Sequence, residues 1–406
     1  MNPARLFILL LLSSLSAFAG SPKIKVGADV LLDDRLDLLK GKRVGVVTNP
    51  TGRTAGGMHI VDALISRGVR VTALFGPEHG IRGEAGAGDA VADAIDAKTG
   101  LTVYSLYGAV RKPTPPMLKD VDVLLYDIQD VGARFYTFIS TMALCMEAAA
   151  EKGIEYVVLD RPNPLGGLLV DGPLLPDSLR TFVGKFPVPV VYGLTIGELA
   201  TMVNEEGWNA RGVKAKLTVV PVEGWTRSMR WNDTGLPWLA PSPNLRTPEA
   251  VLLYPGTCLI EATNLSEGRG TGVPFQFVGA PFLDGERFRS MLKVSDIRGV
   301  RVRDTSITPD ASKFTGRLCH GVVLHPVSPD SLLPVEAGLA LLQSLLHQAP
   351  ESVAVNQRGL AIRLGDPDAL RLLTSGTPVA RIAERWQEPL RRFIALSKRY
   401  RLYPQQ

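Results

Sequence analysis

Ionisable and amide side chains follow five short apolar runs in the first half of the chain. The runs are rich in β-branched residues, and each leads into a loop that carries Gly, Pro or charged residues. Carboxylates, arginines and amides in such positions suit acid and base chemistry on a bound substrate. The residues singled out are Asn49, Glu78, His79, Tyr107, Asp127, Arg134, Tyr136, Asp160, Arg161 and Asn163.

A second dense polar segment, EATNLSEGRGTGVPF, lies in the later half of the chain. Its candidate residues are Glu261, Asn264, Glu267 and Arg269. A turn-rich connector whose charges neutralise one another would explain this composition without a function. A segment so rich in hydrogen-bonding groups and glycine also suits sugar hydroxyls, which need many oriented donors and acceptors.

Several other chemistries are excluded by spacing. The glycines of FGPEHGIRGEAGAG (75–88) run G-x-x-G-x-G, whereas a dinucleotide loop needs G-x-G-x-x-G, and there is no G-x-x-x-x-G-K-[ST]. No H-E-x-x-H or G-x-S-x-G occurs, and His320 and His325 are expected on opposite faces of a strand. We therefore expect no metal, nucleotide or other cofactor.

Some of these residues also have a structural explanation. Asp127 and Asp160 could cap the helices that follow them, or pair with Arg134 and Arg161. Asn163 stands between two prolines and could be a turn residue. The three cysteines, Cys145, Cys258 and Cys319, are far apart and odd in number, and we expect them to be buried thiols.

The elements that must position these side chains form an α/β pattern. The runs RVGVVTN, VRVTALF, LTVYSLY, VDVLLYD and IEYVVLD alternate with helical patterns, which predicts a parallel sheet covered by helices on both faces. In such a sheet ligands bind beyond the carboxyl ends of the strands, where the candidate residues lie. The segment TIGELATMVNEEG predicts a helix capped by Thr195 and Glu198.

A domain boundary is expected near LPWLAPSPNLRTPEA, where three prolines fall within Pro237 to Pro243 and the alternation ends. Beyond it we predict strands in GVRVRD and CHGVVLHPV, and helices near 332–348 and 378–399. This gives an N-terminal Rossmann-like domain over 23–245 and a smaller α+β domain over 246–406.

The first 19 residues have the character of a secretory signal peptide. They contain one Arg, an apolar run from Leu6 to Leu12 and a small-residue end at Ala17-Phe18-Ala19. The apolar run is too short for a membrane-spanning helix, so we expect cleavage, no stable membrane anchor, and a protein that is periplasmic or secreted. Loss of Arg5 lowers the net charge from +5 to +4, with no basic block suited to nucleic acid.

Several long motifs together resemble one known family. GKRVGVVTNPTG, FGPEHGIRG, DIQDVGARFYTFISTM, LDRPNPLGG, TIGELA, TGLPW, PSPN and YPGTCLIEATNLSEGRGT are similar, in this order, to exo-β-N-acetylmuramidases of the NamZ type. The resemblance covers nearly the whole mature chain. It implies a Rossmann-like domain and a smaller C-terminal domain, with the active site in the cleft between them.

The activity implied by the resemblance is hydrolytic release of N-acetylmuramic acid from the non-reducing ends of peptidoglycan fragments. The glutamate of the family's G-P-E-H-G motif, regarded as catalytic, falls on Glu78. Ala262 and Gln276 depart from the usual E-G-T-N and P-F-E motifs, which leaves the second catalytic group and the substrate preference open.

Glycoside hydrolysis commonly needs a second carboxylate beside the proton donor. Asp127, Asp160, Glu261 and Glu267 are all candidates, and the acetamido group of the substrate could serve instead. The lactyl carboxylate could bind Arg134, Arg161 or Arg269. An alternative function is a non-catalytic, exported muropeptide-binding protein.

Overall fold

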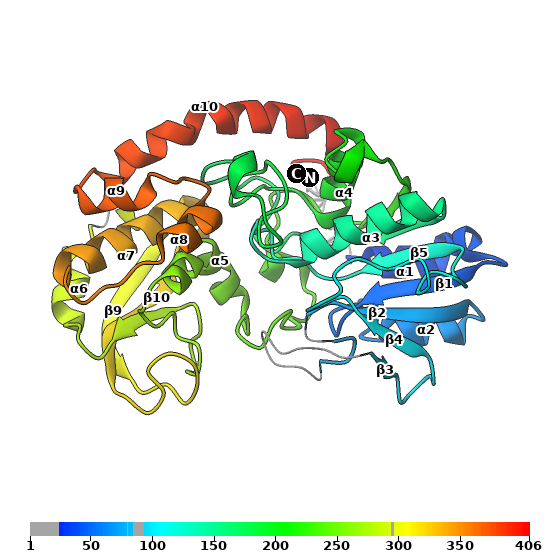
Figure 1. The fold of residues 1–406 in the computed structure, drawn as a ribbon, viewed down its shortest axis with the longest axis horizontal. Coiled ribbons are helices and arrows are strands. Elements are labelled where there is room, and N and C mark those ends of the chain that lie inside the picture. The colour runs from blue at the N-terminus through cyan, green and yellow to red at the C-terminus, as the bar shows by residue number, and fades with distance from the viewer. Residues whose placement is uncertain (1–23, 79, 84–92, 294–295) are drawn as a thin grey trace, which may run out of the picture.

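The computed structural model describes residues 24–78, 80–83, 93–293 and 296–406. Two lobes lie side by side, one built around a large sheet and the other around a small sheet with several helices (Figure 1). The fold class is therefore as predicted, a mostly parallel α/β sheet domain followed by a smaller α+β domain.

The N-terminal lobe contains a seven-stranded sheet with the order β3-β4-β2-β1-β5-β6-β7. All neighbouring strands are parallel except β3 and β4, which pair antiparallel. The strands are β1 (Arg43–Thr48), β2 (Arg70–Gly76), β3 (Ala94–Ile95), β4 (Thr102–Ser105), β5 (Val123–Asp127), β6 (Glu155–Leu159) and β7 (Lys216–Val220).

Helices cover both faces of this sheet, as the continuous apolar runs require. On one face, α1 (Gly27–Asp34) and α2 (Ile60–Ser66) pack with Val44, Val46 and other strand residues into one core cluster. On the other face, α3 (Phe138–Lys152) and α4 (Ile196–Glu205) pack with alternate strand residues. All five predicted strands are confirmed, whereas β3 and β7 were not predicted.

The C-terminal lobe has a three-stranded antiparallel sheet of order β8-β10-β9. The predicted strands and helices of this lobe are confirmed, and β8 was missed. Its elements are α5 (Pro248–Thr257), β8 (Phe277–Ala280), α6 (Gly285–Met291), β9 (Val300–Ile307), β10 (Cys319–Pro326), α7 (Pro334–Gln348), α8 (Gln357–Leu364), α9 (Ala369–Thr374) and α10 (Val379–Ser397).

The two lobes share one hydrophobic core, and the end of the chain ties them together. One cluster of buried side chains runs from the sheet of the first lobe to α5, α7 and α10 of the second. Helix α10 reaches from the C-terminal lobe back over the N-terminal lobe (Figure 1). Beyond it, the backbone N–H of Leu402 donates to Glu198 at 2.8 Å, and the Tyr403 hydroxyl donates to Asp160. The chain end thus belongs to the packing of the first lobe.

Two side chains of the N-terminal lobe bind backbone of the C-terminal lobe. The buried Arg134 guanidinium donates to the carbonyl oxygen of Arg363 at 2.8 Å. The Asp171 carboxyl group accepts a 2.8 Å hydrogen bond from the backbone N–H of Val335, in the first turn of α7. A carboxyl oxygen in this position satisfies an N–H that has no partner within the helix.

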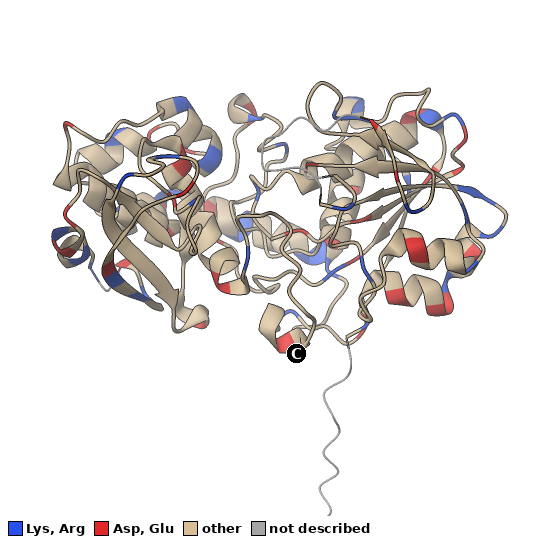
Figure 2. Cartoon of the chain, turned by 90° about the horizontal axis from the view of Figure 1, so that it is seen from below, with Lys and Arg blue, Asp and Glu red and all other residues tan. Residues whose placement is uncertain are grey.

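Charged side chains are distributed over both lobes. Along the chain drawn in Figure 2, segments with basic residues and segments with acidic residues alternate in both lobes. Within the described ranges, no helix has the length and apolar character needed to cross a membrane.

The buried carboxyl of Asp171 predicts a pH-dependent stability. Burial raises its pKa from 3.8 to about 7, partly opposed by the hydrogen bond from Val335. The folded protein therefore keeps this proton up to about pH 7, while the unfolded chain releases it near pH 4. The contribution of Asp171 to the free energy of unfolding should accordingly fall as pH rises from 4 to 7.

Asp171→Asn should make this dependence shallower, because the variant has no proton to release there. Chemical unfolding at several pH values measures the slope. Asp330→Asn is the control, since the Asp330 side chain is 88% exposed. An unchanged slope in Asp171→Asn would contradict the assignment.

Candidate active site

Glu78 lies on a tight turn directly after β2. The turn is closed by a 3.0 Å hydrogen bond from the N–H of Gly80 to the carbonyl oxygen of Pro77. The Glu78 side chain is half-buried, and its Oε2 accepts a 3.4 Å hydrogen bond from the hydroxyl of Thr137, the residue that precedes α3. This places an accessible carboxyl at the carboxyl edge of the sheet, where ligands of this fold class bind.

Tyr107, which follows β4, is a further partner of Glu78. Partial burial raises the pKa of the Tyr107 phenol, and the charge of Glu78 and a hydrogen bond to its carboxylate raise it further. Thr137 and Tyr107 thus both hydrogen-bond to the carboxyl. A fixed orientation is what a proton donor in catalysis requires.

Tyr136 connects Glu78 with the C-terminal lobe. Burial raises the pKa of its phenol well above 10, the negative charges of Glu78 and Asp130 raise it further, and the positive charge of Arg269 acts in the opposite direction. Glu78 of one lobe and Arg269 of the other are therefore both within electrostatic range of one hydroxyl. Among the residues that the structure describes, that buried hydroxyl has no hydrogen-bond partner.

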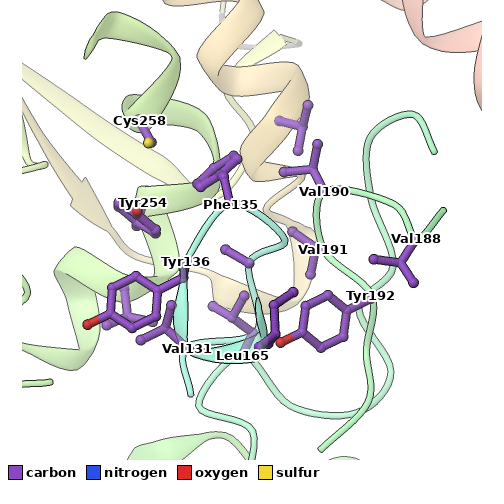
Figure 3. Close-up of a cluster of buried hydrophobic side chains, with 14 of the residues drawn as sticks. Val131, Phe135, Tyr136, Leu165, Val188, Val190, Val191, Tyr192, Tyr254 and Cys258 are labelled. Carbon is purple, nitrogen blue, oxygen red and sulfur yellow. The ribbon is translucent and has the colours of Figure 1, made fainter. Parts of the chain in front are cut away.

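Aromatic contacts make the same connection. The ring centroids of Tyr136 and Tyr254 lie 6.0 Å apart, and those of Tyr254 and Phe275 lie 4.8 Å apart. The guanidinium of Arg269 lies 5.1 Å from the Phe275 ring centroid. Figure 3 shows Tyr136 and Phe135 beside Tyr254 and Cys258 of the C-terminal lobe. These contacts fix the position of the EATNLSEGRGT loop relative to the segment that holds Glu78.

An ion-pair network orders this C-terminal loop. Glu261 pairs with Arg269 at 2.6 Å and with Arg363 at 3.1 Å, and Glu267 pairs with Arg269 at 3.2 Å and with Lys313 at 3.0 Å. Although burial favours the protonated acid, the two guanidinium groups hold the pKa of Glu261 below its ordinary value. The Arg269 side chain remains 27% exposed, so it can still contact a ligand.

The structure therefore brings together six of the predicted site residues: Glu78, Tyr107, Tyr136, Glu261, Glu267 and Arg269. A half-buried carboxyl stands on one lobe and a partly exposed guanidinium on the other. Such a pair can donate a proton and bind an anionic group of the same ligand. His79, also predicted, lies outside the described residues.

Asp127, Asp160 and Arg161 have structural roles at the same edge of the sheet. The Arg161 guanidinium binds Asp127 through two hydrogen bonds of 2.6 and 2.9 Å, and both side chains are buried. Asp160 accepts hydrogen bonds from the Thr195 hydroxyl at 2.7 Å and from the N–H of Gly197 at 2.8 Å, at the start of α4. Their predicted contacts with substrate find no support in this geometry.

The three asparagines that were predicted to bind substrate instead hydrogen-bond within the protein. Asn163 binds Leu165 and Leu194, and Asn264 binds Ser352 and Ala354, in each case through both ends of the amide. The Oδ1 of Asn49 accepts from Thr51, while its Nδ2 is buried without a partner among the described residues. These three residues hold the backbone of their loops in place.

Arg134 is likewise fully buried. Its guanidinium donates to the carbonyl oxygens of Pro173 at 2.7 Å, Val188 at 2.8 Å and Arg363, and burial lowers its pKa to about 9. In place of the predicted contact with a substrate carboxylate, the structure shows an arginine that holds backbone segments together.

Some residues of the site were missed. Thr137 directly follows Tyr136 in a motif that had already been singled out, and its place before a helix was a usable signal. Lys313 and Arg363 are far from Glu261 in sequence, and no local pattern points to them. In the described part of the chain, His, Cys, Asp and Glu side chains do not gather in groups of three or more that could hold a metal ion.

Comparison with known proteins gives matches over almost the whole chain. The model of the N-terminal domain of the exo-β-N-acetylmuramidase NamZ matches residues 44–249, and that of the C-terminal domain matches residues 252–403. A Bacillus subtilis (strain 168) protein named peptidoglycan β-N-acetylmuramidase NamZ is 46% identical over 387 residues, which is 95% of this chain and 92% of the relative.

Two crystal structures of DUF1343 family proteins from Bacteroides fragilis NCTC 9343 have the same fold. One has a TM-score of 0.86 and 36% sequence identity, covering 94% of this chain and 99% of the other. The second has a TM-score of 0.79 and 33% identity, covering 95% and 100%.

The buried pair of Asp127 and Arg161 predicts that loss of the Asp127 charge lowers the stability of the fold, as expected for a structural residue. Asp127→Asn leaves a buried guanidinium without its counter-charge, which should lower the free energy of unfolding by about 3–5 kcal/mol. Urea unfolding measures the loss. Asp122→Asn is the matched control, because Asp122 pairs with Arg43 at the opposite, exposed edge of the sheet and should have a much smaller effect. Equal effects of the two variants would contradict the structural role.

Proposed function

The chain belongs to the NamZ family of exo-β-N-acetylmuramidases, and from the geometry of the lobe interface we propose that Glu78 is the acid that protonates the leaving oxygen. The enzyme is a glycosidase that releases N-acetylmuramic acid from the non-reducing ends of peptidoglycan fragments. The observation that carries the role of Glu78 is its position: a half-buried carboxyl oriented by Thr137 and Tyr107.

Cleavage of the glycosidic bond leaves the bond electrons on the oxygen of the departing sugar. A proton from Glu78 neutralises that oxygen, while positive charge develops at the anomeric carbon. A water molecule supplies the new hydroxyl of the released sugar, and the proton that it gives up restores the acid form of Glu78. Asp127 and Asp160 are buried in structural contacts. The candidates for the second catalytic group are therefore Glu261, Glu267 and the acetamido group of the substrate.

Arg269 is proposed to bind the lactyl carboxylate that distinguishes muramic acid from glucosamine. Within the network described above, Arg269, Arg363 and Lys313 carry three positive charges, and Glu261 and Glu267 carry two negative charges. The surplus of one positive charge complements a single carboxylate. Pairing with an acid on each side also holds the guanidinium in place for a bidentate contact.

The substrates are therefore peptidoglycan-derived saccharides with muramic acid at the non-reducing end. The reaction as proposed uses only side chains and water, so no cofactor takes part. The N-terminal 19 residues support export to the periplasm or the medium, although they lie outside the described residues. Release of a monosaccharide at the cell wall would suit recycling of muramic acid during wall turnover.

Glu78→Gln tests the proposed acid. Glutamine keeps the size and much of the hydrogen bonding but carries no transferable proton, so turnover of the natural disaccharide should fall on the order of 100-fold or more. Substrates with a good leaving group, such as a nitrophenyl muramic acid glycoside, need less protonation and should lose less. Steady-state kinetics on both substrates, with a melting curve to confirm folding, give the result.

Glu286→Gln, on an exposed position of α6, is the control and should retain wild-type turnover. Near wild-type turnover of Glu78→Gln on the disaccharide would place the acid elsewhere. Sugar binding by the wild type without any turnover would instead support the alternative, a muropeptide-binding protein.

Export predicts a specific mature chain. Protein recovered from outside the cytoplasm of a bacterial host should begin at Gly20, because the signal ends at Ala19. Intact-mass measurement checks this. A full-length mass with Met1 retained, in protein found only in the cytoplasm, would refute export.

A further inference from the structure

The loop that follows β4 carries an arginine with no charged partner. Arg111 lies on this loop, four residues after Tyr107, and is exposed to solvent. Among the described residues, none forms an ion pair or a hydrogen bond with the Arg111 side chain. The next residue, Lys112, is by contrast paired with Glu151 at 2.7 Å. The guanidinium of Arg111 is therefore available to an anion from outside the protein.

An aromatic ring holds this guanidinium in place. The guanidinium carbon of Arg111 lies 4.4 Å from the ring centroid of Phe182. The loops of these two residues are both tied to α3, because Glu147 pairs with Lys112 at 3.7 Å and with Lys185 at 3.1 Å. A guanidinium stacked on a ring keeps the N–H groups at its edge available for a bidentate contact with a carboxylate. Arg111 is thus ordered before a ligand binds.

The beginning of α3 connects this stacked pair with the proposed acid. The hydroxyl of Ser140 donates to the carbonyl oxygen of Phe182 at 2.7 Å. Ser140 lies three residues after Thr137, whose hydroxyl donates to the Glu78 carboxyl at 3.4 Å. Because residues three apart are neighbours on the surface of a helix, the backbone of Phe182 lies near the Glu78 carboxyl.

Electrostatic interactions support this proximity and distinguish Arg111 from Arg269. Burial raises the pKa of the Tyr107 phenol, the charge of Glu78 raises it further, and the charge of Arg111 opposes both. For the Tyr136 phenol, which Glu78 also influences, the opposing cation is Arg269. Each cation thus acts on a different tyrosine near the acid, and Arg111 gives the site a second positive charge that is separate from the ion-pair network of Arg269.

The chemistry of a peptidoglycan strand offers this second cation a partner. The two amino sugars alternate along the strand, so the sugar next to the released muramic acid is N-acetylglucosamine, which has no charge. The unit after that is again muramic acid, and it carries a carboxylate in its lactyl group or in its stem peptide. Arg111 follows Tyr107 by four residues, so their Cα atoms are at most about 14 Å apart. A strand whose first glycosidic bond lies at Glu78 can extend over that distance.

We propose that Arg111 binds a carboxylate of the second muramic acid unit, so that the enzyme prefers strands that extend beyond the first disaccharide. The inference rests on the proposed function for the identity of the substrate. The stacked guanidinium is the specificity-determining group, and Phe182 is the residue that positions it. The lactyl group and the stem peptide are two sources of the same carboxylate chemistry, and the substrates used in the test distinguish them.

Hydrolysis of two saccharides measures this preference. The disaccharide of muramic acid and N-acetylglucosamine lacks the second carboxylate, whereas the tetrasaccharide with two such repeats contains it. Arg111→Gln should lower kcat/KM for the tetrasaccharide by about tenfold, the value of one hydrogen bond to a charged group, and leave the disaccharide unchanged. Because Arg111 is exposed, the preference of the wild type for the tetrasaccharide should also decrease as the salt concentration rises.

Two further variants separate a direct contact from a general change in charge. Phe182→Leu removes the ring under the guanidinium and should lower kcat/KM for the tetrasaccharide alone, by about two- to fivefold. Arg180→Gln is the matched control, because Arg180 lies two residues before Phe182 but already pairs with Asp177 at 2.7 Å. It should hydrolyse both saccharides as the wild type does.

Modified tetrasaccharides identify the source of the carboxylate. Conversion of the second lactyl carboxyl to a methyl amide should abolish the effect of Arg111→Gln if the lactyl group is the partner. An effect confined to a tetrasaccharide with a stem peptide on the second muramic acid would assign the contact to the peptide. Both results support the proposal, since both require a carboxylate on that unit.

An equal effect of Arg111→Gln on the disaccharide and on every tetrasaccharide, the neutral methyl amide included, would overturn the proposal, and so would the absence of any effect. Either result in an enzyme that hydrolyses the disaccharide refutes only the role of Arg111. If the wild type hydrolyses neither saccharide, the proposed catalytic function fails instead. Calorimetric binding then decides the role of Arg111, because Arg111→Gln should weaken binding of the tetrasaccharide alone by the same factor.

Discussion

The charges buried at the carboxyl edge of the seven-stranded sheet must be paired, and the layout of the site follows from how they are paired. Asp127 binds Arg161, and Glu198 binds Arg227 at 2.6 Å, all without exposure to solvent beyond a few per cent. Asp160 ties the start of α4 to the chain end through Tyr403. Because an unpaired charge would be prohibitively costly there, these contacts lock the loops after β5 and β6 and dock the C-terminal tail.

Because the acids in the loops after β5 and β6 are paired, the loop after β2 supplies the proposed catalytic carboxyl. Glu78 is half-buried and faces Tyr107 and Thr137, while the buried acids nearby are already engaged. The C-terminal lobe adds Arg269, positioned by two carboxylates and by the aromatic contacts that run through Tyr254. The proposed site therefore combines a rigid scaffold on one lobe with an ordered cation on the other.

More of the fold than of the site could be predicted from the sequence. Continuous β-branched runs identified five parallel strands, and the Thr195 and Glu198 pair identified a helix start, because these are local signals. The two-residue β3 and the charged pattern before β7 carry no such signal. Among polar residues, the sequence shows which stand at strand ends but not which pair with each other. Arg134 was therefore expected at the substrate, yet it binds carbonyl groups across the lobe interface, and Arg363, about 100 residues from its partner, was not expected at all.

A crystal structure with bound N-acetylmuramic acid tests the central claim most directly, namely that the two lobes form one active site around Glu78. The account predicts that the anomeric carbon lies beside the Glu78 carboxyl and that the lactyl carboxylate contacts Arg269. A sugar bound at the opposite edge of the sheet, or one that contacts a single lobe without approaching Glu78, would contradict it.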